Sequence, residues 1–345
     1  MNEIPSIERL SEISQIIIKD EIDYLELKEA LNSFKELLLE ISEMTNEDLN
    51  NRDNIYLDSG KAIAPEWAIR CVDDLLRTKR FICGVYKAVL KVKEQSDKKP
   101  IYILYTGTGP FATLVLPLIT LFSPEEIQFI LVEINTISYE QAKKVFKAFN
   151  AEAYINEFHQ ADAATLKLDS PERIDIHVVE CLQHALAREP QVTITYNIIS
   201  QLKRSAILIP QNIELSILQI NPNLHQEHMM NTNSEKILKP FLIKSEPVYA
   251  LNKDEVLNSK ALDENGQLIF PKKVISIDNP DSASFSQLAI GTDITVFEDE
   301  RLGFAESGLT IPKIIGYQRE GQRINAVETQ YINSNDPELT TKFIH

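Results

Sequence analysis

The sequence has 345 residues, of which 43% are hydrophobic and 25% charged, as in a globular protein large enough for about two domains. Asp and Glu number 51 against 35 Lys and Arg. The resulting net charge of −16 argues against nucleic acid or an anionic membrane as the main partner and favours a cationic acceptor.

Three cysteines without a CxxC pair indicate neither a disulfide framework nor a zinc site, so we expect no metal. The N-terminal residues are acidic and lack the apolar core of a signal peptide. The longest apolar run, from Phe111 to Phe122, is too short to span a bilayer. We therefore expect a cytoplasmic protein.

The N-terminal segment, residues 1–50, is predicted to be helical. Apolar residues recur at helical spacing between positions 6 and 44, which indicates one broken helix or two. We expect this segment to cover the rest of the fold or to form an oligomer contact.

A helix is predicted from Pro65, which suits a first helical turn, to about Val92. Within it, Asp74, Arg77 and Phe81 share one face by their spacing. Because a guanidinium fork matches a carboxylate in a bidentate way, Arg77 is a candidate for binding an anionic ligand group. The alternative is a surface ion pair between Asp74 and Arg77.

Residues 101–133 are the stretch around which the chain is organised. They predict half of a nucleotide-binding unit: a strand, a glycine turn, a helix, and a second strand that ends in an acid. Gly107 and Gly109 allow close approach of a ligand, and the helix behind them offers unpaired N–H groups. Glu133 ends the second strand, where a carboxylate can accept hydrogen bonds from both hydroxyls of a ribose.

The third glycine of the dinucleotide motif is missing, since Phe111 and Ala112 occupy its region. A cofactor without phosphates, such as S-adenosylmethionine, fits a turn with two glycines better. The alternative is that Gly107 and Gly109 serve only the turn between strand and helix.

Strands and helices alternate beyond Glu133, which predicts a Rossmann-like, doubly wound parallel sheet within residues 51–210. We expect a helix at 136–150 and strands at 153–156, 176–179 and 205–209. Asp162 and Glu180 fall at strand ends, where such sheets bind their ligands. Asp162 is a candidate for accepting a hydrogen bond from an adenine amino group.

Glu180 and Glu189 lie nine residues apart in the segment that leaves the strand at 176–179. Two carboxylates beside the reactive end of a cofactor can hold a cationic nitrogen and orient its lone pair. The alternative is a pair of solvated glutamates. His184, between them, is a candidate general base.

Residues 211–345 are predicted to form an all-β second domain for substrate binding or dimerisation. We expect strands at 213–220, 236–243, 268–277, 287–297, 309–317 and 324–332, with turns at Asn265-Gly266 and Asn279-Pro280.

With these residues in place, the chain resembles the protein arginine methyltransferases, class I S-adenosylmethionine-dependent enzymes with a Rossmann-like domain followed by a β-barrel. YLDSGKAIAPEWAIRCVDDLLRTKRF is similar to the segment that covers the cofactor, and YTGTGPFATL and VEINTI are similar to the glycine turn and the ribose-binding segment. DIHVVECLQHALAREP resembles the strand and double-glutamate loop, and ILIPQNIEL resembles the exit to the barrel. The resemblance covers about residues 55 to 215.

This resemblance implies that Arg77 binds the carboxylate of the cofactor and Glu133 its ribose hydroxyls. It also implies that Glu180 and Glu189 form the acceptor site and that the protein is a homodimer.

The chain departs from the family at three places. Tyr105 stands where the family has an acid, so the amino-acid end of the cofactor is expected to be held differently, with Tyr105 among its contacts. Cys181 replaces a tryptophan or its equivalent, and the C-terminal half has no Thr-His-Trp sequence. Cofactor use is therefore better supported than arginine as the acceptor.

The sequence predicts an S-adenosylmethionine-dependent methyltransferase that acts on an amine or guanidine nitrogen of a peptide, protein or small molecule. Glu180 and Glu189 hold this nucleophile. The expected cofactor-binding residues are Arg77, Tyr105, Gly107, Gly109, Glu133 and Asp162.

Two alternatives remain open. The turn GTGPFATLVLPL is similar to that of nicotianamine synthase-like enzymes, which transfer the aminocarboxypropyl arm of the same cofactor. The other alternative is a catalytically silent module that binds a partner through the β domain.

Overall fold

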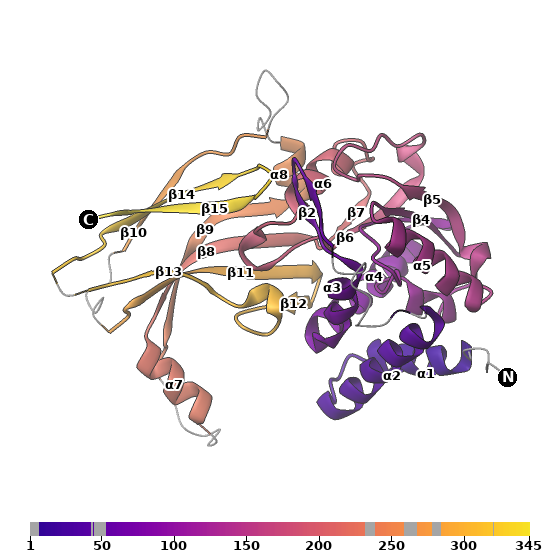
Figure 1. The fold of residues 1–345 in the computed structure, drawn as a ribbon, viewed down its shortest axis with the longest axis horizontal. Helices are drawn as coiled ribbons and strands as arrows, with labels where there is room; N and C mark the ends of the chain where they lie inside the picture. The colour runs from indigo at the N-terminus through magenta and orange to yellow at the C-terminus, as the bar shows by residue number, and fades with distance from the viewer. Residues whose placement is uncertain are drawn as a thin grey trace.

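The computed structural model describes residues 7–42, 44, 53–231, 239–258, 268–277, 284–319 and 321–345. Figure 1 shows an α/β half that follows the N-terminal helices and a β half that ends at the C-terminus, with the two chain ends at opposite ends of the molecule. None of the helices in these described ranges combines the length and the apolarity needed to cross a membrane.

Two N-terminal helices form, α1 (Ile7–Ile17) and α2 (Tyr24–Ser42). Their apolar faces, with Leu10, Ile17 and Phe34 fully buried, belong to the same hydrophobic core as the α/β half. The helices predicted from the spacing therefore form, and they cover that half, which is one of the two roles expected for them.

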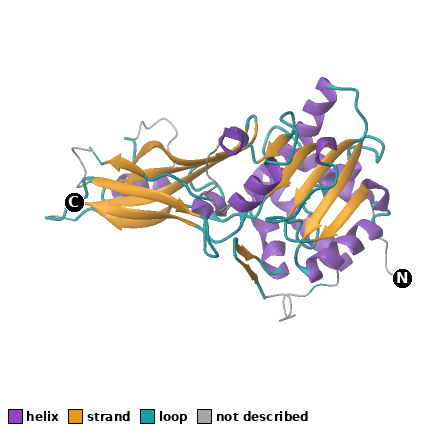
Figure 2. Cartoon of the chain, turned by 90° about the horizontal axis from the view of Figure 1, so that it is seen from above, coloured by secondary structure: helices purple, strands orange, loops and turns teal. Residues whose placement is uncertain are grey.

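The α/β half is built on five parallel strands in the order β5-β4-β3-β6-β7. The doubly wound parallel sheet predicted from the sequence is thus confirmed, with helices on both faces in Figure 2. Parallel strands are covered on both faces, which is why β4 and β6 are buried almost throughout. The strands are β3 (Ile101–Thr106), β4 (Ile127–Glu133), β5 (Ile155–Gln160), β6 (Ile174–Val179) and β7 (Ile207–Ile209).

The helices of this half are α4 (Leu75–Gln95), α5 (Thr136–Ala148) and α6 (Gln191–Ile199). Short 3-10 helices fill the connections: η3 (Leu116–Thr120), η4 (Glu152–Tyr154), η5 (Pro171–Arg173) and η6 (His184–Leu186).

The single helix predicted from Pro65 to Val92 is wrong. The chain forms α3 (Pro65–Arg70), then the 3-10 helix η2 (Cys71–Asp73), and starts again as α4. Asp74 causes the break, because it is extended and its side chain accepts a hydrogen bond from the Arg77 N–H as an N-cap. A small hairpin of β1 (Ile55–Leu57) and β2 (Gly60–Ala62) precedes α3.

The described residues of the C-terminal half form two antiparallel sheets, so the all-β region expected from the sequence is confirmed. One has the order β12-β11-β8-β9 with β13 paired to β11, and the other has the order β10-β14-β15. The strands are β8 (Asn212–Ile220), β9 (Leu242–Asn252), β10 (Lys273–Ser276), β11 (Gln287–Phe297), β12 (Glu300–Leu302), β13 (Lys313–Tyr317), β14 (Ala326–Ile332) and β15 (Glu338–Ile344).

Three short helices also occur in the part of this half that the structure describes. They are α7 (Pro222–Met230), which projects from the sheets in Figure 1, α8 (Lys253–Asn258) and the 3-10 helix η7 (Gly308–Thr310).

Several strand boundaries differ from the prediction. The strand predicted at 236–243 overlaps β9 only at Leu242 and Ile243, since β9 begins at Leu242 and extends to Asn252. β13 begins at Lys313 because η7 takes the place of its first predicted residues. The predicted turns at Asn265-Gly266 and Asn279-Pro280 lie outside the described residues.

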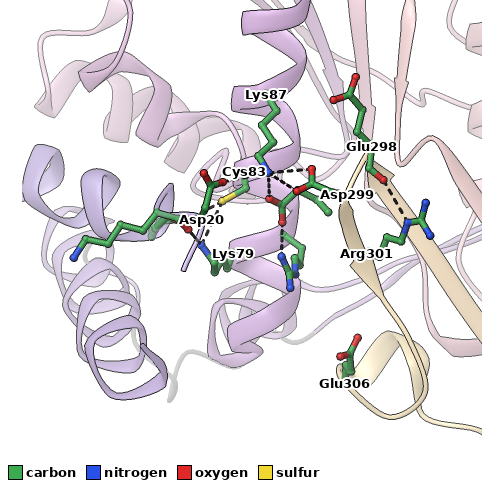
Figure 3. A network of polar contacts seen from close by, with 12 residues as sticks. Asp20, Lys79, Cys83, Lys87, Glu298, Asp299, Arg301 and Glu306 are labelled. Carbon is green, nitrogen blue, oxygen red and sulfur yellow. Dashed lines mark hydrogen bonds and ion pairs between the residues drawn. The ribbon is translucent and has the colours of Figure 1, made fainter. Parts of the chain in front are cut away.

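Helix α4 joins the two halves through a polar network (Figure 3). The carboxylate of the buried Glu300 accepts hydrogen bonds from Lys87 Nζ at 2.6 Å and from Arg80 Nη1 at 2.8 Å. Directly before Arg80 in the helix, the buried Lys79 donates a hydrogen bond from Nζ to the Ile17 carbonyl at the end of α1 at 2.8 Å. A Cβ on Gly84 would lie 2.7 Å from Val296 Cγ1 of β11, so helix and strand are in close contact.

Candidate active site

A cavity of about 1000 Å³, its open mouth included, lies at the carboxyl ends of the parallel strands. The register of the strands accounts for this position. Thr106 of β3 pairs with Val132 of β4 and with Val179 of β6, so the three strands end side by side and the residues that follow them lie close together. The predicted cofactor-binding and acceptor residues all line this cavity, but the candidate base His184 does not: the lining includes Arg77, Tyr105, Gly107, Gly109, Glu133, Asp162, Glu180 and Glu189.

The glycine turn has the conformation that glycine permits, with φ of 74° at Gly107 and 62° at Gly109. Packing also leaves no room for a side chain at Gly107, because a Cβ there would lie 2.2 Å from the Sγ of Cys181. At Gly109 the nearest atom to an added Cβ is that of Ala68 at 3.5 Å, so this residue leaves its backbone open towards the cavity.

The helix expected behind the glycine turn is absent from the described chain. Residues 109–115 form successive turns and lead into the short η3, and Ala112 has a positive φ of 46°. This turn therefore does not offer a ligand the unpaired N–H groups of a regular helix N-terminus.

Glu133 holds the glycine turn in place. Its Oε2 accepts a hydrogen bond from the Gly109 N–H at 2.8 Å, and its Oε1 accepts one from the Asn135 N–H at 2.8 Å. Burial raises the pKa of this carboxyl, and the backbone hydrogen bonds act against that rise. Glu133 also lines the cavity, so its carboxylate is a candidate for accepting hydrogen bonds from a ligand.

Arg77 and Glu180 form a buried ion pair across the cavity, between Arg77 Nη2 and Glu180 Oε2. Burial opposes the charge of Arg77, but Glu180 beside it raises the pKa of the guanidinium above its ordinary value. The side chains are 15% and 8% exposed, which excludes the alternative of a surface pair between Asp74 and Arg77. Asp74 instead receives the Arg77 backbone N–H and caps α4.

The two glutamates of the loop after β6 are buried, so the alternative of solvated side chains is wrong. Glu180 Oε1 has no hydrogen-bond partner among the described residues. Burial raises the pKa of Glu180 against the influence of Arg77. Burial and the neighbouring Glu180 raise the pKa of Glu189 to about 7. The pair therefore carries an unpaired acceptor atom and a carboxyl that titrates near neutral pH.

The double-glutamate loop, residues 180–189, has a strained backbone that its neighbours fix. Lys61 N–H of β2 donates to the Arg188 carbonyl at 2.8 Å, and Arg188 N–H donates to the Pro337 carbonyl at 2.7 Å. The Tyr331 hydroxyl donates to the Leu186 carbonyl at 2.8 Å. Three residues of the loop have positive φ: Ala185 at 59°, Leu186 at 51° and Arg188 at 68°.

Of the two remaining candidate residues, Asp162 lies in the cavity and His184 does not. Asp162 lines the cavity, and its Oδ1 accepts the Ala164 N–H at 2.8 Å. His184 is half-buried and is not among the cavity-lining residues, which weakens its case as a general base. Burial lowers its pKa, and Lys313 and Arg188 lower it further.

Two halves of the chain that are far apart in sequence meet at this site. Asp74 Oδ2 accepts hydrogen bonds from the Ser307 hydroxyl at 2.7 Å and from the Gly308 N–H at 2.8 Å, so η7 of the β half lies at the start of the helix that carries Arg77.

No protein-family model matches the sequence, and no curated protein is significantly similar to it. Solved structures match over most of the chain. A PRMT6 structure has a TM-score of 0.56 at 12% identity and covers 81% of this chain and 99% of its own. PRMT6 with SAH gives 0.54 at 12% identity with the same coverage. The Trypanosoma brucei PRMT1 enzyme-prozyme heterotetrameric complex with AdoHcy gives 0.53 at 13% identity, with 80% and 92% covered.

The fold is that of the protein arginine methyltransferases. The Rossmann-like half and the β half occur in the order that the sequence resemblance implied.

Tyr105, Cys71 and Cys181 also line the cavity. Tyr105 is 4% exposed and lies near Glu180, whose charge adds to the effect of burial in raising the tyrosine pKa. Burial also raises the pKa of Cys71 to about 11 and that of Cys181 well above its ordinary value. Both thiols are therefore protonated at neutral pH and are poor nucleophiles.

Sequence reasoning missed several lining residues, most notably Lys61, Cys71 and Cys181. Lys61 lies on the hairpin of β1 and β2, whose strands of three residues are too short to show a period. No group of three or more His, Cys, Asp or Glu side chains in the described ranges is placed to hold a metal ion.

Proposed function

We propose that this protein is an S-adenosylmethionine-dependent methyltransferase that acts on a nitrogen nucleophile. The observation that carries the proposal is the meeting, in one cavity, of a glycine turn, an acid at the end of β4, a buried arginine and two buried glutamates. The fold shared with proteins solved with AdoHcy or SAH supports the choice of cofactor.

The residues present fit this cofactor along the sheet. Asp162 follows β5, Glu133 ends β4, the glycine turn follows β3 and Glu180 follows β6, and these strands are neighbours in that order. Asp162 would bind the adenine amino group, Glu133 the ribose hydroxyls, and the methionine part would point towards β6. Arg77 has five donors and uses one on Glu180, so others can bind the cofactor carboxylate.

When bound, S-adenosylmethionine supplies a methyl group on a positively charged sulfur. The chain supplies position, a proton acceptor and exclusion of water. Glu180 Oε1, which has no partner among the described residues, would accept a hydrogen bond from the acceptor nitrogen. Glu189, whose pKa is raised to about 7 by burial and then by Glu180, can take a proton from an amine near neutral pH.

Binding of the cofactor is tested by calorimetric titration with S-adenosylmethionine and S-adenosylhomocysteine. Glu133→Ala should weaken both affinities by about tenfold or more, because it removes the acceptor of two hydrogen bonds to a ribose. Glu152→Ala, an exposed glutamate on η4, is the matched control and should bind as the wild type does. Equal affinities in wild type and Glu133→Ala would contradict the assignment of the ribose site.

Turnover is tested with a panel of amines and guanidines. Glu180→Gln should retain cofactor binding and lose turnover. Release of S-adenosylhomocysteine supports methyl transfer, whereas release of methylthioadenosine would indicate transfer of the aminocarboxypropyl arm. Tight binding without turnover of any acceptor would favour a non-catalytic module.

A further inference from the structure

Lys61 is a cation in the cavity that the expected cofactor contacts do not require, and its charge lowers the pKa of Glu189 against the larger effects of burial and Glu180. It lines the cavity, is half-buried, and forms no ion pair with any described residue. Its position is fixed, since its backbone N–H donates to the Arg188 carbonyl at 2.8 Å, next to Glu189. Gly60, just before it, makes this contact possible, because a Cβ there would lie 2.7 Å from the same carbonyl oxygen.

The charges at the β6 end of the cavity do not favour a simple cation. Arg77 and Glu180 neutralise each other as an ion pair. Lys61 is positive, and Glu189 is only partly ionised near neutral pH, because burial and Glu180 raise its pKa to about 7. Glu133 and Asp162 belong to the other end, beyond β4 and β5, where both accept backbone N–H groups. The net charge at the acceptor end of the cavity is therefore close to zero or positive, although the net charge of the whole chain is −16.

A guanidinium on an otherwise cationic peptide would meet Lys61 with only the partly ionised Glu189 to compensate the two positive charges. An acceptor with its own anionic group would satisfy Lys61 and still present a nitrogen to Glu180 and Glu189. We infer that the acceptor is an amine or guanidine that also carries a carboxylate or phosphate, and that Lys61 binds this anionic group. The inference rests on the proposed function and specifies its substrate class.

The test uses pairs of small probes that differ in the anionic group: L-arginine and agmatine, L-ornithine and putrescine, O-phosphoethanolamine and ethanolamine. Each is titrated into the full-length protein saturated with S-adenosylhomocysteine. The fluorescence of Trp67, the only tryptophan, reports binding, because its neighbour Ala68 lines the cavity. The first two pairs test a carboxylate and the third a phosphate.

In the wild type, the acidic member of at least one pair should bind about fivefold more tightly than its partner. Lys61→Gln should abolish this preference and Lys61→Glu should reverse it. Lys144→Gln, an exposed lysine on α5, should keep it. Titration with methylthioadenosine, which lacks the cofactor carboxylate, checks that Lys61 does not serve the cofactor.

Three results would overturn the inference. The first is equal affinity within every pair, or no binding of any acidic probe, and the second is a preference for the acidic probe that survives in Lys61→Gln. The third is that Lys61→Gln loses affinity for S-adenosylhomocysteine but not for methylthioadenosine. In each of these the wild type still binds S-adenosylhomocysteine, so the proposed function stands. Failure of the wild type to bind S-adenosylhomocysteine would instead contradict the proposed function itself.

Discussion

Glu189 should destabilise the folded protein at alkaline pH, and its replacement should therefore stabilise it. Burial and then Glu180 raise the pKa of this carboxyl from 4.5 to about 7. Because the folded state holds the proton more tightly than the unfolded state, stability is lost as pH rises from 4.5 through about 7. One pKa unit corresponds to about 1.4 kcal/mol, so the loss reaches about 3 kcal/mol at pH 8 and is less than about 1 kcal/mol at pH 5.

Glu189→Gln removes the titration and keeps the shape of the side chain. We expect the free energy of unfolding to rise by about 3 kcal/mol at pH 8 and to change by less than about 1 kcal/mol at pH 5. Urea denaturation followed by circular dichroism and by Trp67 fluorescence measures both values. The matched control is Glu152→Gln, which replaces an exposed glutamate and should change stability little at either pH. If Glu189→Gln lost stability equally at pH 5 and pH 8, the argument from a buried carboxylate would fail.

Two further substitutions test the packing of the cavity by the same denaturation assay. Arg77→Met leaves Glu180 buried without its cation and should lower the free energy of unfolding by about 3 kcal/mol. The double variant Arg77→Met/Glu180→Gln should recover most of this loss. Similar losses in the single and double variants would show that the ion pair is not the cause. Gly107→Ala forces a Cβ to 2.2 Å from the Sγ of Cys181 at a φ of 74° and should cost about 2 kcal/mol or more, with Cys181→Ala recovering part of the loss. A Gly107→Ala variant as stable as the wild type would refute the contact with Cys181.

The sheet and the residues at its carboxyl edge could be predicted because their signals are local. A run such as Ile127–Glu133 is apolar from Phe129 to Val132 and then ends in an acid, which identifies both a strand buried on two faces and an acid at its end. Parallel strands then bring their ends to one edge regardless of the lengths of the connections. This is why residues as distant as Gly107 and Glu180 could be expected in one cavity.

The remaining features depend on contacts that the local sequence does not contain. The helix expected after Gly109 does not form, since Pro117 lacks an N–H and its ring blocks the preceding turn of a helix. Arg77 and Glu180 are 103 residues apart, so nothing near either residue indicates that they pair. The double-glutamate loop has positive φ without a single glycine, because bonds from β2 and from Pro337 impose its shape. The break at Asp74 is different, since an aspartate before a helical run is an N-cap signal that the sequence does contain.

Because of helix α4, the chain cannot be divided into independent α/β and β fragments. This helix carries Arg77 at its first turn, receives the β half through Glu300 and Val296, and holds the end of α1 through Lys79. A fragment that ended with β7 would expose the close-packed surface around Gly84 and leave two cations of α4 without their carboxylate. The α/β half is therefore not a transferable cofactor-binding module. Substitutions in β11 and β12, remote from the cavity in sequence, act on the same helix that presents Arg77.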